Sequence, residues 1–204
     1  MIDCGIAILL SVSVVSIILP HGSASYHSER TYYDDSDKGT DSGGLGSREA
    51  RAQAFLNGTM WLEIASASWS WADAKGWVIW NFWSPYSLYN VQVSADFTAF
   101  GYVWTWYASA HLWFKLEVGG KSTEYYEWFG NTWTDEISRS KTISIDYGTM
   151  TAYQVYTIKA TIRIHCENCA IVDLESNAPK PLGPQYLPNY EGFGRVTRIA
   201  VDAS

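Results

Sequence analysis

The sequence has few charged residues and no cluster of basic ones. Lys, Arg, Asp and Glu together make up 17% of the 204 residues, and the formal net charge is -7. A nucleic-acid partner requires grouped Lys and Arg side chains that neutralise phosphates. The composition therefore argues against a nucleic-acid-binding role.

Helical patterning is also missing. Beyond the N-terminal segment, no stretch of ten or more residues repeats apolar side chains with a helical period, and no internal repeat is evident. Aromatic residues are abundant instead, with 11 Trp and 14 Tyr. Such a balance suits β-sheets with a polar surface of Ser, Thr, Asn and Tyr. The chain length favours a single domain with a sizeable core.

The N-terminus resembles an export signal. An uncharged stretch from Cys4 to His21 contains Pro20 and is followed by small residues up to Ala24. We expect residues 1–24 to be a secretory signal peptide that is cleaved, although no basic residue precedes the apolar run. The alternative is a retained membrane anchor, for which the apolar run is short. We accordingly predict a secreted or cell-surface protein with no stable membrane span after processing.

Residues 25–51 lack apolar periodicity and are rich in Asp, Ser and Gly. Such a composition buries too little surface to offset its ordering entropy. We therefore predict a flexible acidic tail over 25–51 and a folded domain over 52–204. The acidic "DDSD" run lacks the glycine and closing Glu of a calcium loop, and we expect neither a metal nor a cofactor.

Alternation with a period of two predicts strands from Phe55 onward. It continues from residue 87 to residue 118, which is longer than a normal strand and predicts a bulge. Eight to ten such strands close most economically as an all-β sandwich or jelly roll of two antiparallel sheets. Within 104–118, the residues expected on the interior side are Trp104, Trp106, Ala108, Ala110, Leu112, Phe114, Leu116 and Val118.

The pair Gly119 and Gly120 predicts a tight hairpin, because glycine accepts the positive φ angles of such a turn. Counting outward from this turn places four large rings on the outer side of two paired strands. These candidate ligand- or partner-binding residues are His111, Trp113, Tyr126 and Trp128. They could stack on sugar rings, bind another protein, or be covered by the Pro-rich segment 176–190.

The same count sets Glu127 on the inner side, opposite Leu112, where an ionised carboxylate would need a partner. We favour a bulge after Tyr126 that would turn Glu127 outward. A functional cleft at Glu127 is the alternative.

Two segments, "TEYYEWFG" and "NYEGFGRVTRIAV", resemble the catalytic segments of the jelly-roll xylanases. The resemblance covers fewer than twenty residues and implies Glu124 as nucleophile and Glu191 as acid and base, because retaining hydrolysis uses two carboxyl groups. The thumb sequence of that family is absent and the interval between the two Glu residues is short. Opposite Glu124 in the hairpin, Lys115 offers the carboxylate a simple ion-pair partner.

Cys166 and Cys169 flank Glu167 and Asn168, which we interpret as a two-residue turn. Cysteines opposite each other across a hairpin lie near the separation that a disulfide tolerates, so we predict a Cys166–Cys169 disulfide. A zinc site would need a second pair of ligands. A thiol redox site would normally need a following helix.

The sequence as a whole predicts a secreted, non-enzymatic β-sandwich that acts through its surface, as an adhesion, matrix or filament subunit. Its partners would be other extracellular proteins or further copies of itself. The first alternative is a carbohydrate-binding module with an aromatic platform for polysaccharide, and the second is a jelly-roll glycoside hydrolase.

Overall fold

The computed structural model describes residues 25–130, 135–174 and 193–204, and every regular element in these ranges is a β-strand. All strand pairings are antiparallel. The strands are β1 (Tyr26–Arg30), β2 (Asp35–Gly44), β3 (Arg48–Ala54), β4 (Thr59–Ser66), β5 (Ser70–Phe82), β6 (Leu88–Val118), β7 (Lys121–Gly130), β8 (Asp135–Met150), β9 (Tyr156–Leu174) and β10 (Phe193–Ala203).

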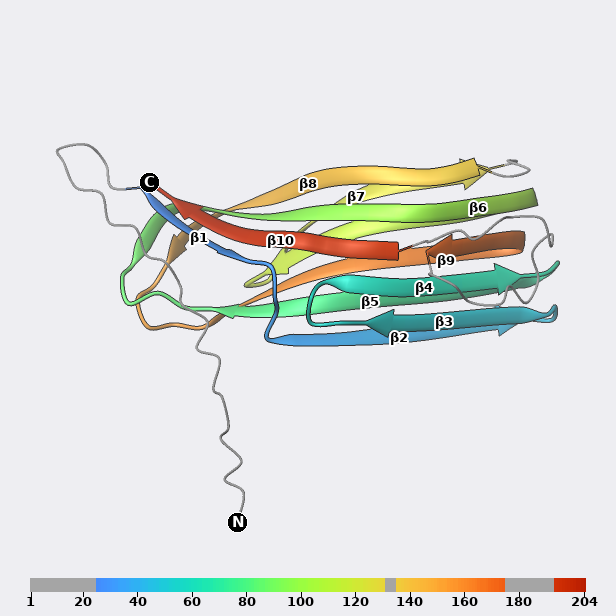
Figure 1. Cartoon of the computed structure of the whole chain (residues 1–204), viewed down its shortest axis with the longest axis horizontal. Helices are drawn as coiled ribbons and strands as arrows, with labels where there is room; N and C mark the ends of the chain where they lie inside the picture. Colours follow the sequence, from blue (N-terminus) through green and yellow to red (C-terminus); the bar gives the residue numbers. More distant parts are fainter. Residues whose placement is uncertain (1–24, 131–134, 175–192) are drawn as a thin grey trace, which may run out of the picture.

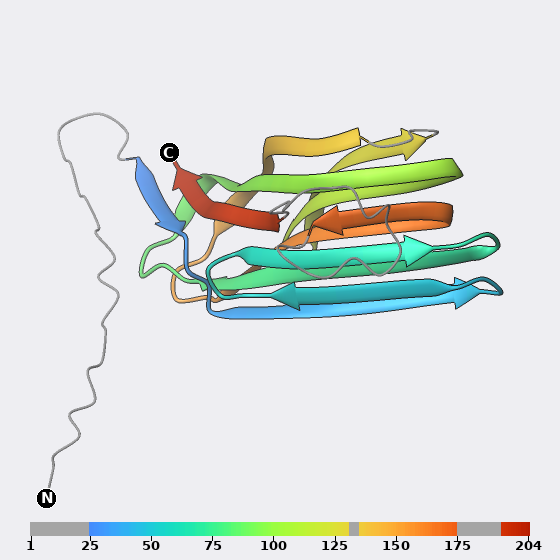
Figure 2. The ribbon, with the colours of Figure 1, turned by 45° about the vertical axis from the view of Figure 1, so that its right-hand side comes forward.

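The strands form two stacked layers, as the sequence predicted (Figures 1 and 2). The first layer has the order β2-β5-β9-β6-β7, and it uses the C-terminal half of β6. The second layer has the order β3-β4-β10-β6-β8, and it uses the N-terminal half of β6. The end of β9 also pairs with β4, in line with β10. Strands β6 and β9 therefore belong to both layers.

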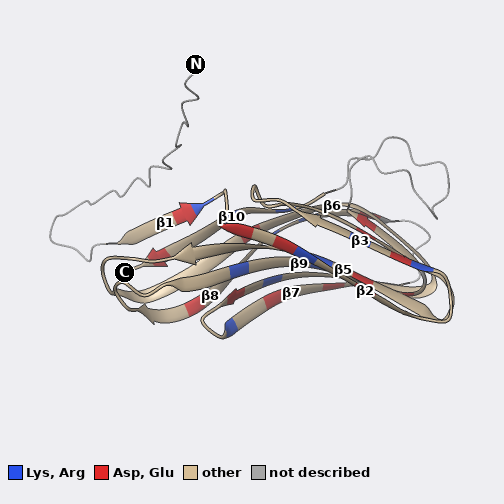
Figure 3. Ribbon diagram, turned by 90° about the horizontal axis from the view of Figure 1, so that it is seen from below, with Lys and Arg blue, Asp and Glu red and all other residues tan. Residues whose placement is uncertain are grey.

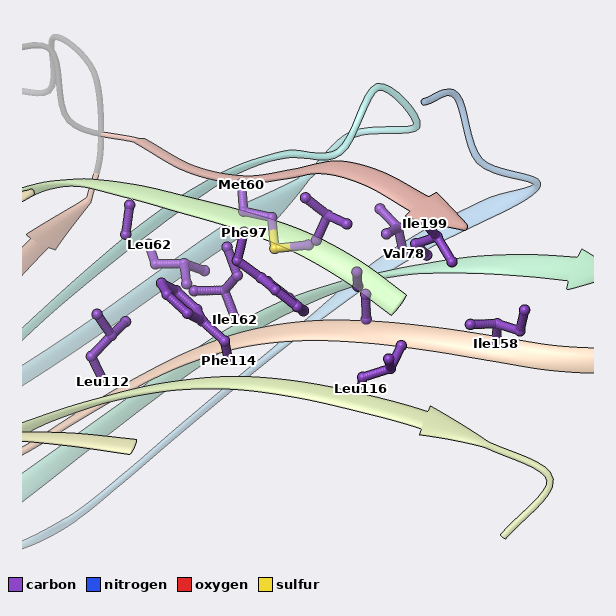
Figure 4. Packing of buried hydrophobic residues seen from close by; sticks show 14 of the residues in the cluster. Met60, Leu62, Val78, Phe97, Leu112, Phe114, Leu116, Ile158, Ile162 and Ile199 are labelled. Atoms are coloured by element: carbon purple, nitrogen blue, oxygen red, sulfur yellow. The ribbon is translucent and has the colours of Figure 1, made fainter. Parts of the chain in front are cut away.

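Alternating apolar residues of the two layers meet in one interior (Figure 4). The ring of Phe97 from the second layer stacks on the ring of Phe114 from the first, with centroids 5.1 Å apart. Both side chains are fully buried. Because large buried rings dominate the burial of apolar surface, this contact joins the two layers at the centre of the core.

Strand β6 contains a bulge that the sequence predicted, but the bulge changes which residues face inward. Its register with β9 shifts between Trp106 and Ser109. Odd-numbered residues such as Val103 are buried before the shift, and even-numbered residues such as Ala110 are buried after it. The inward placement predicted for Trp104 and Trp106 is therefore wrong, and Trp106 is 49% exposed.

The prediction of a flexible tail over 25–51 is also wrong. This segment contains β1, β2 and the first part of β3. Strand β2 pairs with β5 over its whole length, from Asp35 opposite Ile79 to Gly44 opposite Ser70. An edge strand of this kind is held by backbone hydrogen bonds to its neighbour, which do not require apolar side chains. Composition alone therefore failed to reveal it.

The predicted Cys166–Cys169 disulfide is not present. Strand β9 continues through residues 167 and 168 instead of turning back, so the two positions lie three residues apart on one strand. Such a separation is roughly 10 Å, which is longer than a disulfide allows. Cys166 is a free, buried thiol 3.2 Å from the hydroxyl of Ser66, and burial raises its pKa to about 11.

Glu127 faces inward without a bulge, so the bulge predicted after Tyr126 is wrong. The pairing of β7 with β6 continues without a shift from Lys121 to Gly130. The Nε of Arg139 on β8 donates to both carboxylate oxygens of Glu127, at 2.7 and 2.9 Å. The carboxylate is thus paired at the edge where β7 and β8 close the sandwich.

Three sequence predictions lie outside the described residues: the signal peptide at 1–24, Glu191, and the Pro-rich segment 176–190. In the described part of the chain, no helix is long and apolar enough to cross a membrane.

Candidate ligand-binding face

The outer side of the first layer carries the four candidate binding residues that the sequence predicted. Its outward residues form rows of cross-strand partners that run from β2 to β7, and we call this surface the aromatic face. Three neighbouring rows are Gly43, Trp71, Glu167, Ser109 and Gly130; then Asp41, Asp73, His165, His111 and Trp128; then Gly39, Lys75, Arg163, Trp113 and Tyr126. Figure 3 shows acidic and basic positions along β5, β9 and β7.

The four rings predicted from the hairpin count lie together on this face. His111 pairs with Trp128 and Trp113 pairs with Tyr126, in the predicted register. The imidazole of His111 stacks on Trp113, with centroids 5.4 Å apart, and its Nδ1 lies 2.7 Å from the hydroxyl of Tyr126. Tyr126 and Trp128 are 48% and 59% exposed. Within the described ranges, the rings of Tyr126 and Trp128 are thus open to a ligand.

Strands β5 and β9 form the other half of the face. The sequence did not predict this half. Arg163 lies over the ring of Trp113, at 4.8 Å from its centroid, and its Nε donates to Asp73 at 2.6 Å. Trp71 stacks against His165 with a centroid distance of 6.0 Å. The rings of β6 and β7 thus continue into a second group of aromatic and charged side chains.

The pKa values of two histidines on the face are shifted in opposite directions. The carboxylate of Asp73, 3.3 Å from Nδ1, raises the pKa of His165 above its ordinary value, and Glu167 adds to this effect. Burial and the neighbouring His165 lower the pKa of His111. For Asp73 itself, burial would raise the pKa, but His165 and Arg163 outweigh it and the pKa is lowered. Near neutral pH, His111 is therefore the more readily uncharged partner.

Two glycines on edge strands let tryptophan rings lie flat against the sheet. A Cβ at Gly43 would come within 2.7 Å of the indole nitrogen of Trp71, and a Cβ at Gly130 would clash with the ring of Trp128. Glycine has no Cβ atom. The indoles of Trp71 and Trp128 therefore occupy the space that a Cβ atom at Gly43 or Gly130 would fill. The rings are held against the backbone and present their outer faces.

A depression of about 580 Å³ lies on the β2 side of the aromatic face. Its lining combines the rings of Trp71 and His165 with charged and polar side chains from β5 and β9, including Lys75, Arg163 and Glu167. Pockets of this volume suit small ligands or parts of larger ones. The face thus offers a hollow beside its exposed rings.

Of the two carboxyl groups in the glycoside hydrolase hypothesis, Glu124 lies in the described part of the chain and Glu191 lies outside it. Glu124 is exposed opposite Lys115 on the aromatic face, while the ammonium of Lys115 lies 2.9 Å from Glu117. Among the described residues, no group of three or more His, Cys, Asp or Glu side chains could hold a metal ion.

Comparisons with known proteins find no matching family model and no matching curated protein. Solved structures that share part of the fold include the enzymatically active domain of tailspike protein 4 from bacteriophage CBA120, at 8% identity and a TM-score of 0.30. This alignment covers 67% of the present chain but only 18% of the tailspike chain.

Two further similar structures are carbohydrate-binding modules. One, from the β-sandwich superfamily, is 10% identical, with a TM-score of 0.26 and coverage of 73% of this chain and 71% of the other. A family 11 module from Clostridium thermocellum is 14% identical, with a TM-score of 0.22 and coverage of 66% and 87%. Scores this low carry no argument about function, so function must be inferred from the aromatic face itself.

Proposed function

We propose that this protein is an exported, non-catalytic β-sandwich that binds carbohydrate on its aromatic face. The observation that carries the proposal is the contiguous group of Trp113, Tyr126 and Trp128, with Trp71 on the same face. Rings of this kind stack on the apolar faces of sugars. The intervening polar side chains supply donors and acceptors for sugar hydroxyls.

The mixture of rings and polar groups supports a sugar more than a protein partner. A stable protein interface has an apolar, charge-depleted centre, whereas here Arg163, Asp73 and His165 lie among the rings. Such side chains can hydrogen-bond hydroxyl groups without leaving the partners that fix them in place.

An assembly subunit, which the sequence favoured, has less support. Polymerisation through sheet edges requires an edge strand that accepts another strand. One of the two edge strands of the first layer is β2, and it carries Asp35, Asp37, Lys38 and Asp41. Charged residues at an edge oppose such pairing.

The proposal is tested by electrophoresis of the protein through native gels that contain single polysaccharides: mixed-linkage glucan, xylan, galactomannan or polygalacturonate. The intact protein should be retarded by at least one of them. Replacing Trp113 and Trp128 together by Ala should weaken retention about tenfold, which corresponds to about 1.4 kcal/mol.

A matched control is the pair Thr98→Ala and Ser140→Ala, which are cross-strand partners on the outer side of the second layer. Its retention should equal that of the intact protein. Trp128→Ala alone provides a variant in which an exposed ring is removed with little risk to folding. Failure of every polysaccharide to retard the intact protein would refute the proposal, as would unchanged retention of the double tryptophan variant.

A further inference from the structure

A second hollow, of about 470 Å³, lies where the aromatic face ends, and it is lined by Ser68, Trp69, Trp106, Tyr107 and Asn168. We infer that this hollow binds the end of a neutral saccharide chain whose body lies along the aromatic face. The inference rests on the proposed function and adds to it a separate subsite with its own residues.

Backbone strain is concentrated at this hollow. Five non-glycine residues in the described ranges have positive φ, and three of them line it: Trp69 at 64°, Tyr107 at 50° and Asn168 at 60°. Asn tolerates this conformation, but for bulky side chains it is unfavourable. Strain of this kind persists only where the surroundings enforce it, and it is enriched at ligand sites.

The surroundings of the hollow enforce these conformations. The hydroxyl of Ser66 donates to the backbone carbonyl of Asn168 and also contacts the thiol of Cys166. The carbonyl of Trp69 accepts a 2.9 Å hydrogen bond from the backbone N–H of Leu45. Two separate hydrogen bonds thus hold the backbone at Asn168 and Trp69, two of the three strained residues, before a ligand arrives.

The chemistry of the lining favours an uncharged ligand with both apolar faces and hydroxyl groups. Trp69 and Tyr107 are 81% and 83% exposed, and the rings of Trp106 and Tyr107 meet at an angle of 49°. Among the described residues, no Asp, Glu, His, Lys or Arg lines the hollow, while Asn168 offers an exposed amide. Tilted rings with an amide at their rim can enclose one sugar unit. The absence of Lys and Arg from this lining disfavours an anionic lipid surface.

The hollow continues the aromatic face along the strands. Trp69 precedes Trp71 by two residues, and Asn168 follows Glu167, the cross-strand partner of both Trp71 and Ser109. A chain that runs parallel to the strands over the rings therefore arrives at this hollow. The arrangement assigns the rings of β6 and β7 to the chain interior and the hollow to its terminus.

The test uses a double variant, Trp69→Gly with Tyr107→Gly, which removes two rings while glycine accepts the left-handed backbone without strain. The probes are oligosaccharides, from disaccharide to octasaccharide, cut from whichever polysaccharide retards the intact protein most. Isothermal titration should show affinity rising with length in the intact protein. The variant should lose about tenfold in affinity for the longest probes and nothing for the shortest, with a melting temperature unchanged or higher.

The matched control is Tyr153→Gly, which removes an exposed tyrosine at another positive-φ position and should leave every affinity unchanged. Equal affinities for intact protein and variant at all lengths would overturn this inference and leave the proposed function standing. No binding by the intact protein would overturn the proposed function and, with it, the inference. If phosphatidylcholine vesicles bind the intact protein and the variant loses that binding, the hollow contacts lipid and the inference is wrong.

Discussion

The two outer surfaces of the sandwich differ sharply in side chains although the strands beneath them are built alike. The aromatic face carries Trp71, Trp113, Tyr126 and Trp128. From residue 94 to residue 98 of β6, the outer side of the second layer carries rows of small, polar or charged residues, and we call this part the plain face; the rings of Phe100 and Phe193 pair beyond it. Three of these rows, from β8 through β6 to β10, are Ser144, Ser94 and Ala200; Thr142, Asp96 and Arg198; and Ser140, Thr98 and Arg195.

This difference shows what the exposed rings are not needed for. The plain face pairs β6 with β8 and β10 over comparable lengths without exposed tryptophans. Cross-strand aromatic contacts stabilise a sheet by only about 0.2–1 kcal/mol per pair, and the three rows of the plain face pair without them. The rings on the aromatic face therefore point to a role outside folding.

The largest expected effect on the free energy of unfolding comes from the core between the two faces. Phe97→Ala should lower the free energy of unfolding by about 3–5 kcal/mol, because it leaves a cavity beside Phe114 at the junction of the layers. Urea titration followed by circular dichroism measures the loss. Trp128→Ala, on the aromatic face, should shift the same quantity by only about 0.5 kcal/mol. Equal losses for the two variants would mean that the outer ring is structural after all.

A smaller effect is expected where β7 of the aromatic layer meets β8 of the plain one. Glu127→Gln should lower the free energy of unfolding by about 1–3 kcal/mol, because it removes charge-assisted hydrogen bonds from Arg139. Arg139 also lowers the pKa of Glu127 in the folded state. The carboxylate therefore stabilises the fold above its unfolded pKa, and this contribution disappears as the pH falls through the folded pKa. Denaturation at about pH 7 and about pH 3 should show the difference between wild type and variant shrinking in acid; a constant difference would contradict the assignment.

The aromatic face should also respond to mild acid more than the plain face. His111, faced by His165 and Arg163 from β9 and by Tyr126 from β7, has a lowered folded pKa. Its protonation favours the unfolded chain, so stability should fall as the pH drops below about 6.5. His165, whose folded pKa is raised, acts in the opposite direction and is most stabilising in acid. His111→Gln should flatten the loss of stability between about pH 7 and about pH 5, and a slope identical to the wild type would disprove this role.

The smallest effect is expected on the plain face itself. Replacing the paired residues Ser94 and Ser144 by Ala should change the free energy of unfolding by less than about 0.5 kcal/mol. Retention by polysaccharide gels should be unaffected. A clear loss of retention in this variant would place carbohydrate on both faces and remove the contrast between them.

Local patterning predicted the hairpin of β6 and β7 well. Gly119 and Gly120 both have positive φ, and the register that follows from this turn is the one observed. Nothing local could reveal that β5 and β9 lie beside this hairpin, because their pairing depends on the tertiary fold. Trp71, Arg163 and His165 were therefore not recognised as neighbours of Trp113.

The wrong predictions have a common physical origin, namely backbone conformations that the residue types do not indicate. Tyr107 and Asn168 adopt positive φ where β6 and β9 shift register. Because neither position is occupied by glycine, no residue type there indicates that Trp104 and Trp106 turn outward or that β9 continues through residues 167 and 168. Strand β2 was missed because its edge position requires little apolar surface.

The register shift in β6 has an evolutionary consequence. Removing or adding one residue between Trp106 and Ser109 would exchange inside for outside along the following strand, because side chains alternate strictly between the two sides. Leu112, Phe114 and Leu116 would be turned to solvent while the rings beside them entered the core. The number of residues between Trp106 and Ser109 should therefore be invariant among homologues of this protein.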